Sequence, residues 1–367
     1  MIRSLKGGNF QLFPMEKAIE LNDLDKDFTE NITLKQCEDE MNYISNNWKL
    51  FEKDWQNITR IIQPYDGMKK KLIIQSEIVE TSTKEVRPTN AFMKMYEGMI
   101  LLDELGWIQK QTKISLLDLA SAPGMFILAV EQYIKNNHNM SFEWLATSYI
   151  PEGDELYLQD EFGIYRKNPK QFLNANILTE EGVKSIIDFE KDRRINLITG
   201  DIGIPHGYEE SQEIQHHYLQ WGQAYVATER CSVGGAIFLK MYSHIYPTST
   251  RLLNSIRSCF DRLYIIKPQT SRVFNHESYI LGVDRNNKTL NMTPILKELI
   301  SDTSLSESER ILRGKCISFH YDLAVLGNML VNKEYKKEIS ERVRKWKDDM
   351  EKINKYLIDV FYEKFKK

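Results

Sequence analysis

Cysteine is scarce in this chain: only four of its 367 residues are cysteines, and they are far apart. Cys37, Cys231, Cys259 and Cys316 show no paired spacing, so they suggest neither a zinc cluster nor a disulfide framework. No run approaches the roughly 18 apolar residues that a membrane span requires. Residues 1–13 lack the apolar core of a secretion signal. We therefore expect a cytoplasmic protein in a reduced compartment, without a metal site or membrane contact.

The chain also has no excess of basic residues. The chain has 49 lysines and arginines against 52 acidic residues, which gives a formal net charge of −3. This balance argues against a protein that coats nucleic acid through its overall charge, so any nucleic-acid contact must come from a local basic patch. Internal repeats and low-complexity tracts are also absent. The length suits one large α/β domain with helical additions, or two domains.

The most informative stretch is residues 116–126, with the sequence LLDLASAPGMF. An apolar run ends in Asp118, a turn of small residues follows, and a helical pattern then continues through Tyr133. This order is typical of a strand in an open α/β sheet that presents a helix N-terminus and its own backbone to a ligand. A purely structural turn between a strand and a helix gives the same pattern, so this stretch alone does not decide the function.

Strands and helices alternate on both sides of this stretch. Helical periodicity is expected over residues 90–105, 212–230 and 248–260, and strands over residues 114–119, 142–147, 195–199, 262–267 and 277–283, with a turn that leads into a buried strand over 234–240. The alternation predicts an α/β fold with a mostly parallel, doubly wound sheet. The last strand would be antiparallel if its first residue shares an edge of the sheet with the ends of the others.

Both flanks show helical periodicity. Residues 33–63 have one apolar stripe that includes Trp48 and Trp55, and burial of these tryptophans between helices is favoured over base stacking. From residue 333 the chain is highly charged and heptad-like. We expect this segment to pack on the body or against the N-terminal helix, with binding of a protein partner as the alternative. The predicted division is a helical extension over 1–85, a central domain over 86–286 and a second helical extension over 287–367.

Three charged residues lie at the ends of expected strands. Asp201 follows one strand, Lys240 ends another and Glu277 begins the last. Any one of them could simply mark where the sheet meets water. On one edge together they would form a site, because carboxylates can hold and tune a lysine.

These residues resemble the signature of the FtsJ-like S-adenosylmethionine-dependent RNA ribose 2′-O-methyltransferases, a Lys-Asp-Lys-Glu tetrad on a Rossmann-like sheet. Residues 89–94 match the helix with the first lysine, and residues 234–240 match the strand with the second. The most specific match is Lys267-Pro268, then Ser271-Arg272, then Glu277 with Tyr279 two residues later. The resemblance implies a catalytic tetrad of Lys94, Asp201, Lys240 and Glu277, with Lys240 as general base, and substrate contacts from Ser271 and Arg272.

The resemblance also implies S-adenosylmethionine as cofactor, bound by Ala120, Ser121, Ala122, Pro123, Gly124, Phe126, Ser148, Tyr149, Asn176 and Asp201. The chain departs from the family pattern here. Ala120 replaces the first glycine of the loop, the aromatic residue is displaced to Phe126, and the usual acids fall on Ser148 and Asn176. Serine can still form hydrogen bonds, and asparagine offers both a donor and an acceptor to an adenine edge.

The implied function is RNA ribose 2′-O-methylation, with the first transcribed nucleotide of capped mRNA as the expected substrate. Ribosomal or transfer RNA is the alternative within this enzyme class, and a catalytically silent RNA-binding or scaffolding subunit is the alternative outside it. Residues 145–151, residues 222–224 and the flanks look most similar to family members of large cytoplasmic DNA viruses, which would place the protein in the host cytoplasm or the virion. The basic residues nearest the tetrad in sequence, Arg272 and residues 69–71, are the expected phosphate contacts.

Overall fold

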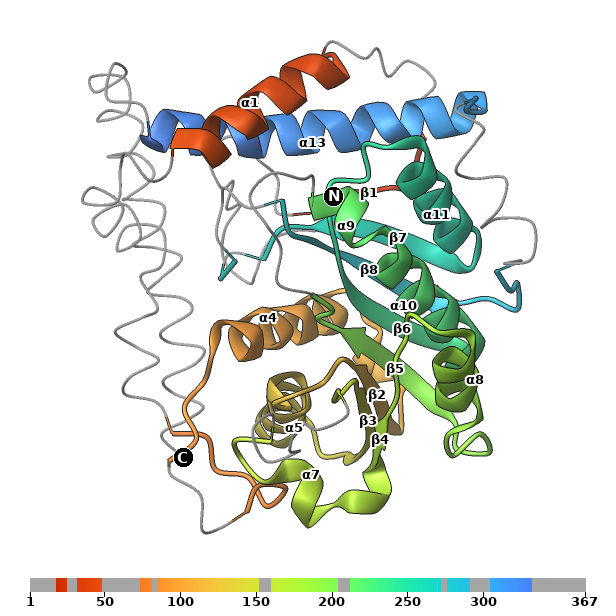
Figure 1. Ribbon diagram of the computed structural model, residues 1–367. Coiled ribbons are helices and arrows are strands. Elements are labelled where there is room, and N and C mark those ends of the chain that lie inside the picture. The colour runs from red at the N-terminus through yellow and green to blue at the C-terminus, as the bar shows by residue number, and fades with distance from the viewer. Residues whose placement is uncertain are drawn as a thin grey trace.

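The computed structural model describes residues 18–24, 32–47, 73–80, 85–151, 160–203, 212–268, 270–271, 276–290 and 304–331. One eight-stranded sheet organises them, in the order β1-β7-β8-β6-β5-β2-β3-β4 (Figure 1). The strands are β1 (Ala18–Glu20), β2 (Lys113–Leu119), β3 (Ser141–Ser148), β4 (Phe172–Asn174), β5 (Ile195–Gly200), β6 (Cys231–Met241), β7 (Phe260–Ile266) and β8 (Ser278–Arg285).

The pairing confirms the predicted class, a mostly parallel Rossmann-like sheet. Strands β4, β3, β2, β5 and β6 pair in parallel, each with its neighbour. Strand β8 runs antiparallel to both β6 and β7, as expected for the strand that follows Glu277. Because of this reversal, the start of β8 lies at the same edge of the sheet as the ends of β5 and β6.

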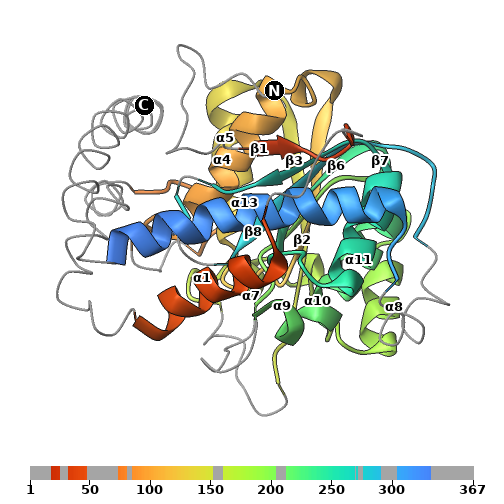
Figure 2. The same cartoon turned by 90° about the horizontal axis from the view of Figure 1, so that it is seen from above.

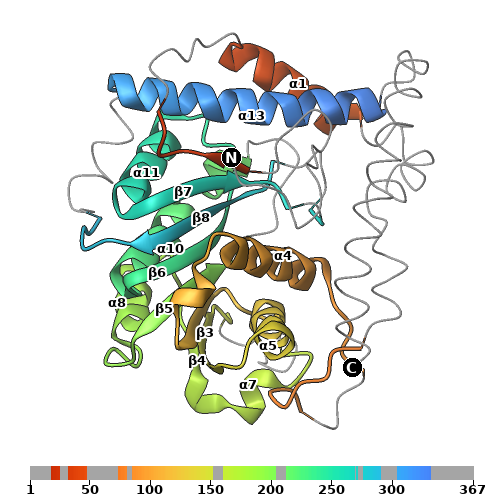
Figure 3. The same ribbon diagram turned by 180° about the vertical axis from the view of Figure 1, so that it is seen from behind.

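Helices cover both faces of the sheet, because successive strand residues point to opposite sides. Leu116 and Phe238 pack on the side of α4 (Asn90–Glu104) and α5 (Met125–Asn137), which Figure 3 shows from behind. Leu117 and Leu239 pack on the side of α8 (Glu180–Asp188), α10 (His217–Arg230) and α11 (Pro247–Ser258). The remaining short helices are α7 (Ile164–Lys167), α9 (Gln212–Gln215), η2 (Ile108–Lys110) and η3 (Pro169–Gln171).

The flanking helices differ from the sequence expectation. Helix α1 (Leu34–Asn47) covers the first part of the stripe expected over 33–63, and residues 48–63, with both tryptophans, lie outside the described residues. Helix α13 (Glu307–Val331), which the periodicity did not reveal, lies beside α1 (Figures 1 and 2). The heptad-like segment from residue 333 also lies outside the described residues, so its packing and any partner stay predictions. The two predicted domain boundaries, at residues 85/86 and 286/287, likewise stay predictions.

Among the described elements, others were also not predicted or differ in form from the prediction. Strand β1 adds an edge strand from the N-terminal flank, and β4 and α8 follow β3. The single helix expected over 212–230 is two helices, α9 and α10, that meet at His216. Glu213 of α9 explains the break in physical terms, because its carboxylate accepts the backbone N–H groups of Ile245 at 3.1 Å and Tyr246 at 3.0 Å. This ties α9 to the chain after β6 rather than to the axis of α10.

The described residues include all four cysteines and can be searched for metal clusters and for membrane-spanning helices. All four cysteines are buried and free. Within the described ranges no cluster of His, Cys, Asp or Glu could hold a metal ion, and no helix is long and apolar enough to span a membrane.

Candidate active site

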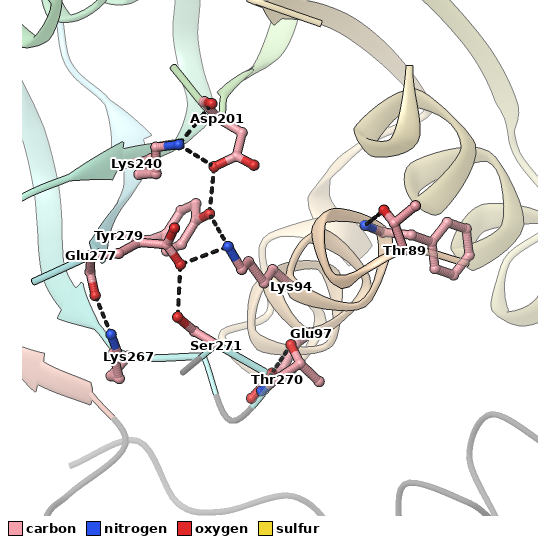
Figure 4. Close-up of polar contacts among 11 residues, drawn as sticks. Thr89, Lys94, Glu97, Asp201, Lys240, Lys267, Thr270, Ser271, Glu277 and Tyr279 are labelled. Atoms are coloured by element: carbon pink, nitrogen blue, oxygen red, sulfur yellow. Dashed lines mark hydrogen bonds and ion pairs between the residues drawn. The ribbon is translucent and has the colours of Figure 1, made fainter. Parts of the chain in front are cut away.

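Four charged residues from four elements meet at the edge of the sheet where β5 and β6 end (Figure 4). Lys94 lies near the start of α4, Asp201 follows β5, Lys240 is near the end of β6 and Glu277 precedes β8. Lys94 Nζ lies 2.6 Å from Glu277 Oε1, and Lys240 Nζ lies 3.1 Å from Asp201 Oδ1. The structure therefore brings together all four residues of the expected tetrad, as two lysine–carboxylate pairs.

Tyr279 of β8 joins the two pairs. Its hydroxyl donates to Asp201 Oδ1 at 2.6 Å and accepts a hydrogen bond from Lys94 Nζ at 3.3 Å. The ring stacks on Phe238 with centroids 4.7 Å apart, which fixes its orientation. Burial and the nearby charges of Asp201 and Glu277 raise the pKa of Tyr279 well above its ordinary value, so the hydroxyl stays protonated and donates. The Glu-x-Tyr spacing was visible in the sequence, but it did not reveal this bridging contact.

Glu277 is held from several sides. Ser271 Oγ donates to its Oε1 at 2.7 Å, and Lys267 Nζ donates to its main-chain carbonyl at 2.5 Å. Burial acts to raise the pKa of Glu277, but the charges of Lys94, Lys267 and Lys240 outweigh this effect and lower it to about 2. Burial lowers the pKa of Lys267 to about 7, with Lys94 acting in the same direction and Glu277 opposing. Glu277 is thus a carboxylate at neutral pH.

The segment with the expected substrate contacts is attached to α4. Thr270 donates to Glu97 Oε2 through its backbone N–H at 3.4 Å and its hydroxyl at 3.3 Å (Figure 4). Glu97 is buried and lies three residues after Lys94 on the same helix. The hydroxyl hydrogen of Ser271 is used on Glu277, so this side chain orients a tetrad residue. Arg272 and residues 69–71 lie outside the described residues, so their phosphate contacts stay predictions.

The chain after β5 wraps around the amine of Lys240. Besides Asp201 Oδ1, Lys240 Nζ contacts the main-chain oxygen of Asp201 at 2.9 Å. A Cβ atom added to Gly203 would lie 3.0 Å from Lys240 Nζ. A side chain at position 203 would therefore press on the amine, and glycine leaves it room.

The small-residue loop joins β2 to α5, as the sequence predicts. Ala120 and Gly124 both have positive φ, at 50° and 93°, and Gly124 is the N-cap of α5. No side chain caps this helix, so its first-turn N–H groups suit an anionic group. Ala122 and Pro123 are half-buried in the same turn. A Cβ added to Gly124 would lie 2.6 Å from Ile164 Cδ1, so the loop packs against α7 with no room for a side chain.

Two of the residues expected to bind the cofactor point into the protein. The ring of Phe126 is buried, with its centroid 6.1 Å from that of Phe238. Ser121 is buried too; its hydroxyl donates to Asp118 Oδ2 at 2.5 Å and accepts from the hydroxyl of Tyr165 at 3.0 Å. Burial raises the pKa of Asp118 to about 7, because the carboxylate has lost its hydration. The contacts by which Asp118 and Tyr165 support the loop were not predicted from the sequence.

The other expected cofactor residues lie at the neighbouring strand ends. Ser148 is the last residue of β3, and the side chain of Tyr149 after it is 52% exposed. Asn176 follows β4, and its Oδ1 accepts the backbone N–H of Leu178 at 3.0 Å. Strands β2, β3 and β4 are parallel neighbours, so these residues share an edge with the loop and with Asp201. The uncapped helix and the exposed tyrosine together fit a ligand that has an anionic group and a flat ring.

Comparison with known proteins identifies one family. The family model described as FtsJ-like methyltransferase matches residues 89–285. A protein of African swine fever virus named probable methyltransferase EP424R is 29% identical over 255 residues, which cover 64% of this chain and 56% of the viral protein. The cap-specific mRNA (nucleoside-2′-O-)-methyltransferase 2 of Danio rerio is 26% identical over 258 residues, which cover 66% of this chain and 34% of that protein. The match thus spans about half the length of the first relative and a third of the second.

Solved structures give a weaker likeness. A putative ribosomal RNA methyltransferase from Plasmodium falciparum covers 52% of this chain and 96% of its own, at 14% identity and a TM-score of 0.36. This likeness adds nothing to the argument from the sequence comparisons and the geometry.

Proposed function

Because this chain belongs to the FtsJ-like methyltransferase family, which uses S-adenosylmethionine, we propose that it methylates the ribose 2′-hydroxyl of RNA. The observation that carries the proposal is the pair of linked lysine–carboxylate contacts at the edge of the sheet, Lys240 with Asp201 and Lys94 with Glu277. A hydroxyl acceptor has to lose a proton, and the Lys240 amine, oriented by Asp201 beside the cofactor loop, is placed to accept it when the amine is unprotonated.

Each part of the site has a role in this reaction. S-adenosylmethionine supplies, when bound, a methyl group on a positively charged sulfur. The 120–124 loop, the first turn of α5, Ser148, Tyr149 and Asn176 would hold it. Lys240, as the unprotonated amine, accepts the proton of the 2′-hydroxyl, and Asp201 orients the amine through two contacts. General-base help of this kind contributes roughly 10²–10⁴-fold, and alignment of two bound reactants can remove about 7–11 kcal/mol of barrier.

Lys94 and Glu277 complete the site. Glu277 stays ionised because three lysines surround it, and its carboxylate holds the amine of Lys94. The proposed role of this pair is to orient the ribose next to Lys240. A charged lysine at this position also suits an RNA substrate, whose neighbouring phosphates are negative.

The proposed substrate is the first transcribed nucleotide of capped mRNA. Support comes from the similarity to a relative whose name states cap-specific mRNA 2′-O-methylation. The proposed site of action is the cytoplasm. For a viral protein, as EP424R is, this means the host cytoplasm or the virion. Methylation of ribosomal or transfer RNA is the second candidate, and an RNA-binding subunit without activity is the third.

Transfer of a labelled methyl group from S-adenosylmethionine tests the proposal. The full chain is given capped RNA, the same RNA without a cap, and capped RNA with a 2′-deoxy first nucleotide. We expect label in the first RNA only, and none with Lys240→Ala. Equal labelling of the first two RNAs would overturn the cap-dependent substrate, and labelling of the deoxy RNA would overturn the first nucleotide as the target. Normal RNA binding without labelling of any RNA would favour the silent subunit.

A further inference from the structure

Gln223 of α10 lies behind the pair formed by Lys240 and Asp201. Its side chain is fully buried, and its Nε2 donates to the main-chain carbonyl of Lys240 at 2.7 Å. The contact joins the middle of a helix to the backbone of a tetrad residue whose side chain points to the edge of the sheet. The expected site residues do not include this glutamine.

The contact lies where strand pairing ends. The last register pair between β5 and β6 is Gly200 with Leu239, so β5 has no residue beside Lys240. The chain instead turns away at Asp201 and wraps around the amine of Lys240. Gln223 supplies an N–H donor to the carbonyl of Lys240 just beyond the last pair, which satisfies a buried backbone acceptor.

The same amide also fits closely against Gly200, the residue before Asp201. A Cβ added to Gly200 would lie 3.0 Å from Gln223 Oε1. Among the described residues this oxygen has no hydrogen-bond partner of its own. Burial of an amide whose oxygen lacks a hydrogen-bond partner costs free energy. If residue 223 only filled space, an apolar side chain would stabilise the fold more. The amide is therefore placed against both strands at the points from which Asp201 and Lys240 extend.

We propose that Gln223 is a positioning residue for the proposed methyl transfer, holding the main chain of Lys240 at a fixed distance from Gly200 and Asp201. This inference rests on the proposed function, in which Lys240 is the general base. Because the amide acts on the backbone, it sets the direction of the lysine side chain without touching either reactant.

Helix α10 offers a matched control in Gln220. This residue is also buried, and within the described part of the chain neither its Oε1 nor its Nε2 has a hydrogen-bond partner. Gln223→Leu and Gln220→Leu thus make the same chemical change on the same helix, but only the first removes a bond to Lys240. We expect Gln223→Leu to lower kcat by roughly 10-fold or more, since small misplacements of reacting groups cost up to about 10²-fold. The KM for RNA and the affinity for S-adenosylmethionine should stay unchanged, and Gln220→Leu should keep wild-type kcat.

A second variant separates a positioning role from a merely structural one. Gln223→Glu keeps the shape of the side chain and can donate only when its carboxyl group is protonated. Its kcat relative to wild type should fall as pH rises, whereas the deficit of Gln223→Leu should be the same at every pH. Equal deficits at all pH values in both variants, together with equal losses of Tm, would mean that the residue only supports the fold.

Hydrogen–deuterium exchange gives a readout that does not require methyl transfer. Gln223→Leu should speed exchange in peptides that cover residues 198–203 and 238–242, and Gln220→Leu should not. If wild type transfers no methyl group, the proposed function fails, and the exchange result still decides whether Gln223 holds these two segments. Unchanged exchange, or unchanged kcat in an active enzyme, would overturn the proposal.

Discussion

Tyr279 donates a hydrogen bond to Asp201 at 2.6 Å and thereby connects residues from strand β8 and from the end of strand β5. Lys94 contacts the same hydroxyl at 3.3 Å, so one phenol lies between the two ion pairs. Each pair is only partly exposed, which strengthens these contacts relative to the same contacts in water. The tetrad is therefore one connected network of hydrogen bonds and ion pairs.

Tyr279→Phe should weaken this network without removing the base. The ring can keep its stacking on Phe238, but Asp201 loses one hydrogen bond, which typically contributes about 1.5–3 kcal/mol when it involves a charged group. We expect lower stability to urea and a kcat between those of wild type and Lys240→Ala. Tyr133→Phe is the control, because it also removes a buried phenol hydroxyl that donates to a carboxylate, that of Asp103, outside the tetrad and the cofactor loop. If both variants had the same kcat, the bridge would have no role in turnover.

Lys240→Ala and Lys240→Arg should both abolish methyl transfer. Alanine removes the amine, whereas arginine keeps a positive charge near Asp201 but cannot give up its proton in a protein. Both variants should bind S-adenosylmethionine as wild type does, which calorimetry can measure. Turnover by Lys240→Arg near the wild-type level would show that Lys240 contributes charge and is not a base.

Gly124→Ala should cost more stability than the same change at Gly106. Both glycines have positive φ, at 93° and 74°, where alanine pays roughly 1–2 kcal/mol. Only at Gly124 does the new Cβ meet a neighbour, Ile164 Cδ1 at 2.6 Å, while Gly106 has open space. Urea unfolding of the two variants isolates the contact, and Gly124→Ala should in addition weaken binding of S-adenosylmethionine. Equal stabilities of the two variants would show that Ile164 of α7 can move aside at little cost in free energy.

Asp118→Asn should remove one contribution to the pH dependence of stability. Burial raises the pKa of Asp118 from 3.8 to about 7, so between these values the folded protein binds more protons than the unfolded chain. The contribution of Asp118 to the free energy of unfolding is therefore full below pH 3.8 and is lost as pH rises through about 7. The stability of wild type minus that of Asp118→Asn should fall over this range. Glu213, whose pKa is raised to about 7 in the same way, is present in both proteins and cancels in the difference. A flat difference would mean that burial does not raise the pKa of Asp118.

The sequence alone determined the order of the longer strands of the central sheet and of the helices between them, except α8, because burial in a sheet requires apolar runs and burial of a helix requires a period of 3.6. It also predicted that Asp201, Lys240 and Glu277 would meet, since the ends of neighbouring strands in an open α/β sheet share an edge. The motif resemblance added Lys94, which no strand end would have revealed. Short or weakly patterned elements such as β1 and β4 were missed, because three residues carry no measurable period.

Only the tertiary structure decided how the tetrad is held. The contacts of Tyr279 with Asp201, of Gln223 with Lys240 and of Glu97 with Thr270 join residues 17 to 173 positions apart, and no local pattern encodes such pairs. The structure also directs the side chains of Ser121 and Phe126 into the protein, which their place in the loop did not predict. A loop sequence fixes which backbone shapes are allowed, but the direction of each side chain depends on what packs beneath it, here Asp118, Tyr165 and Phe238.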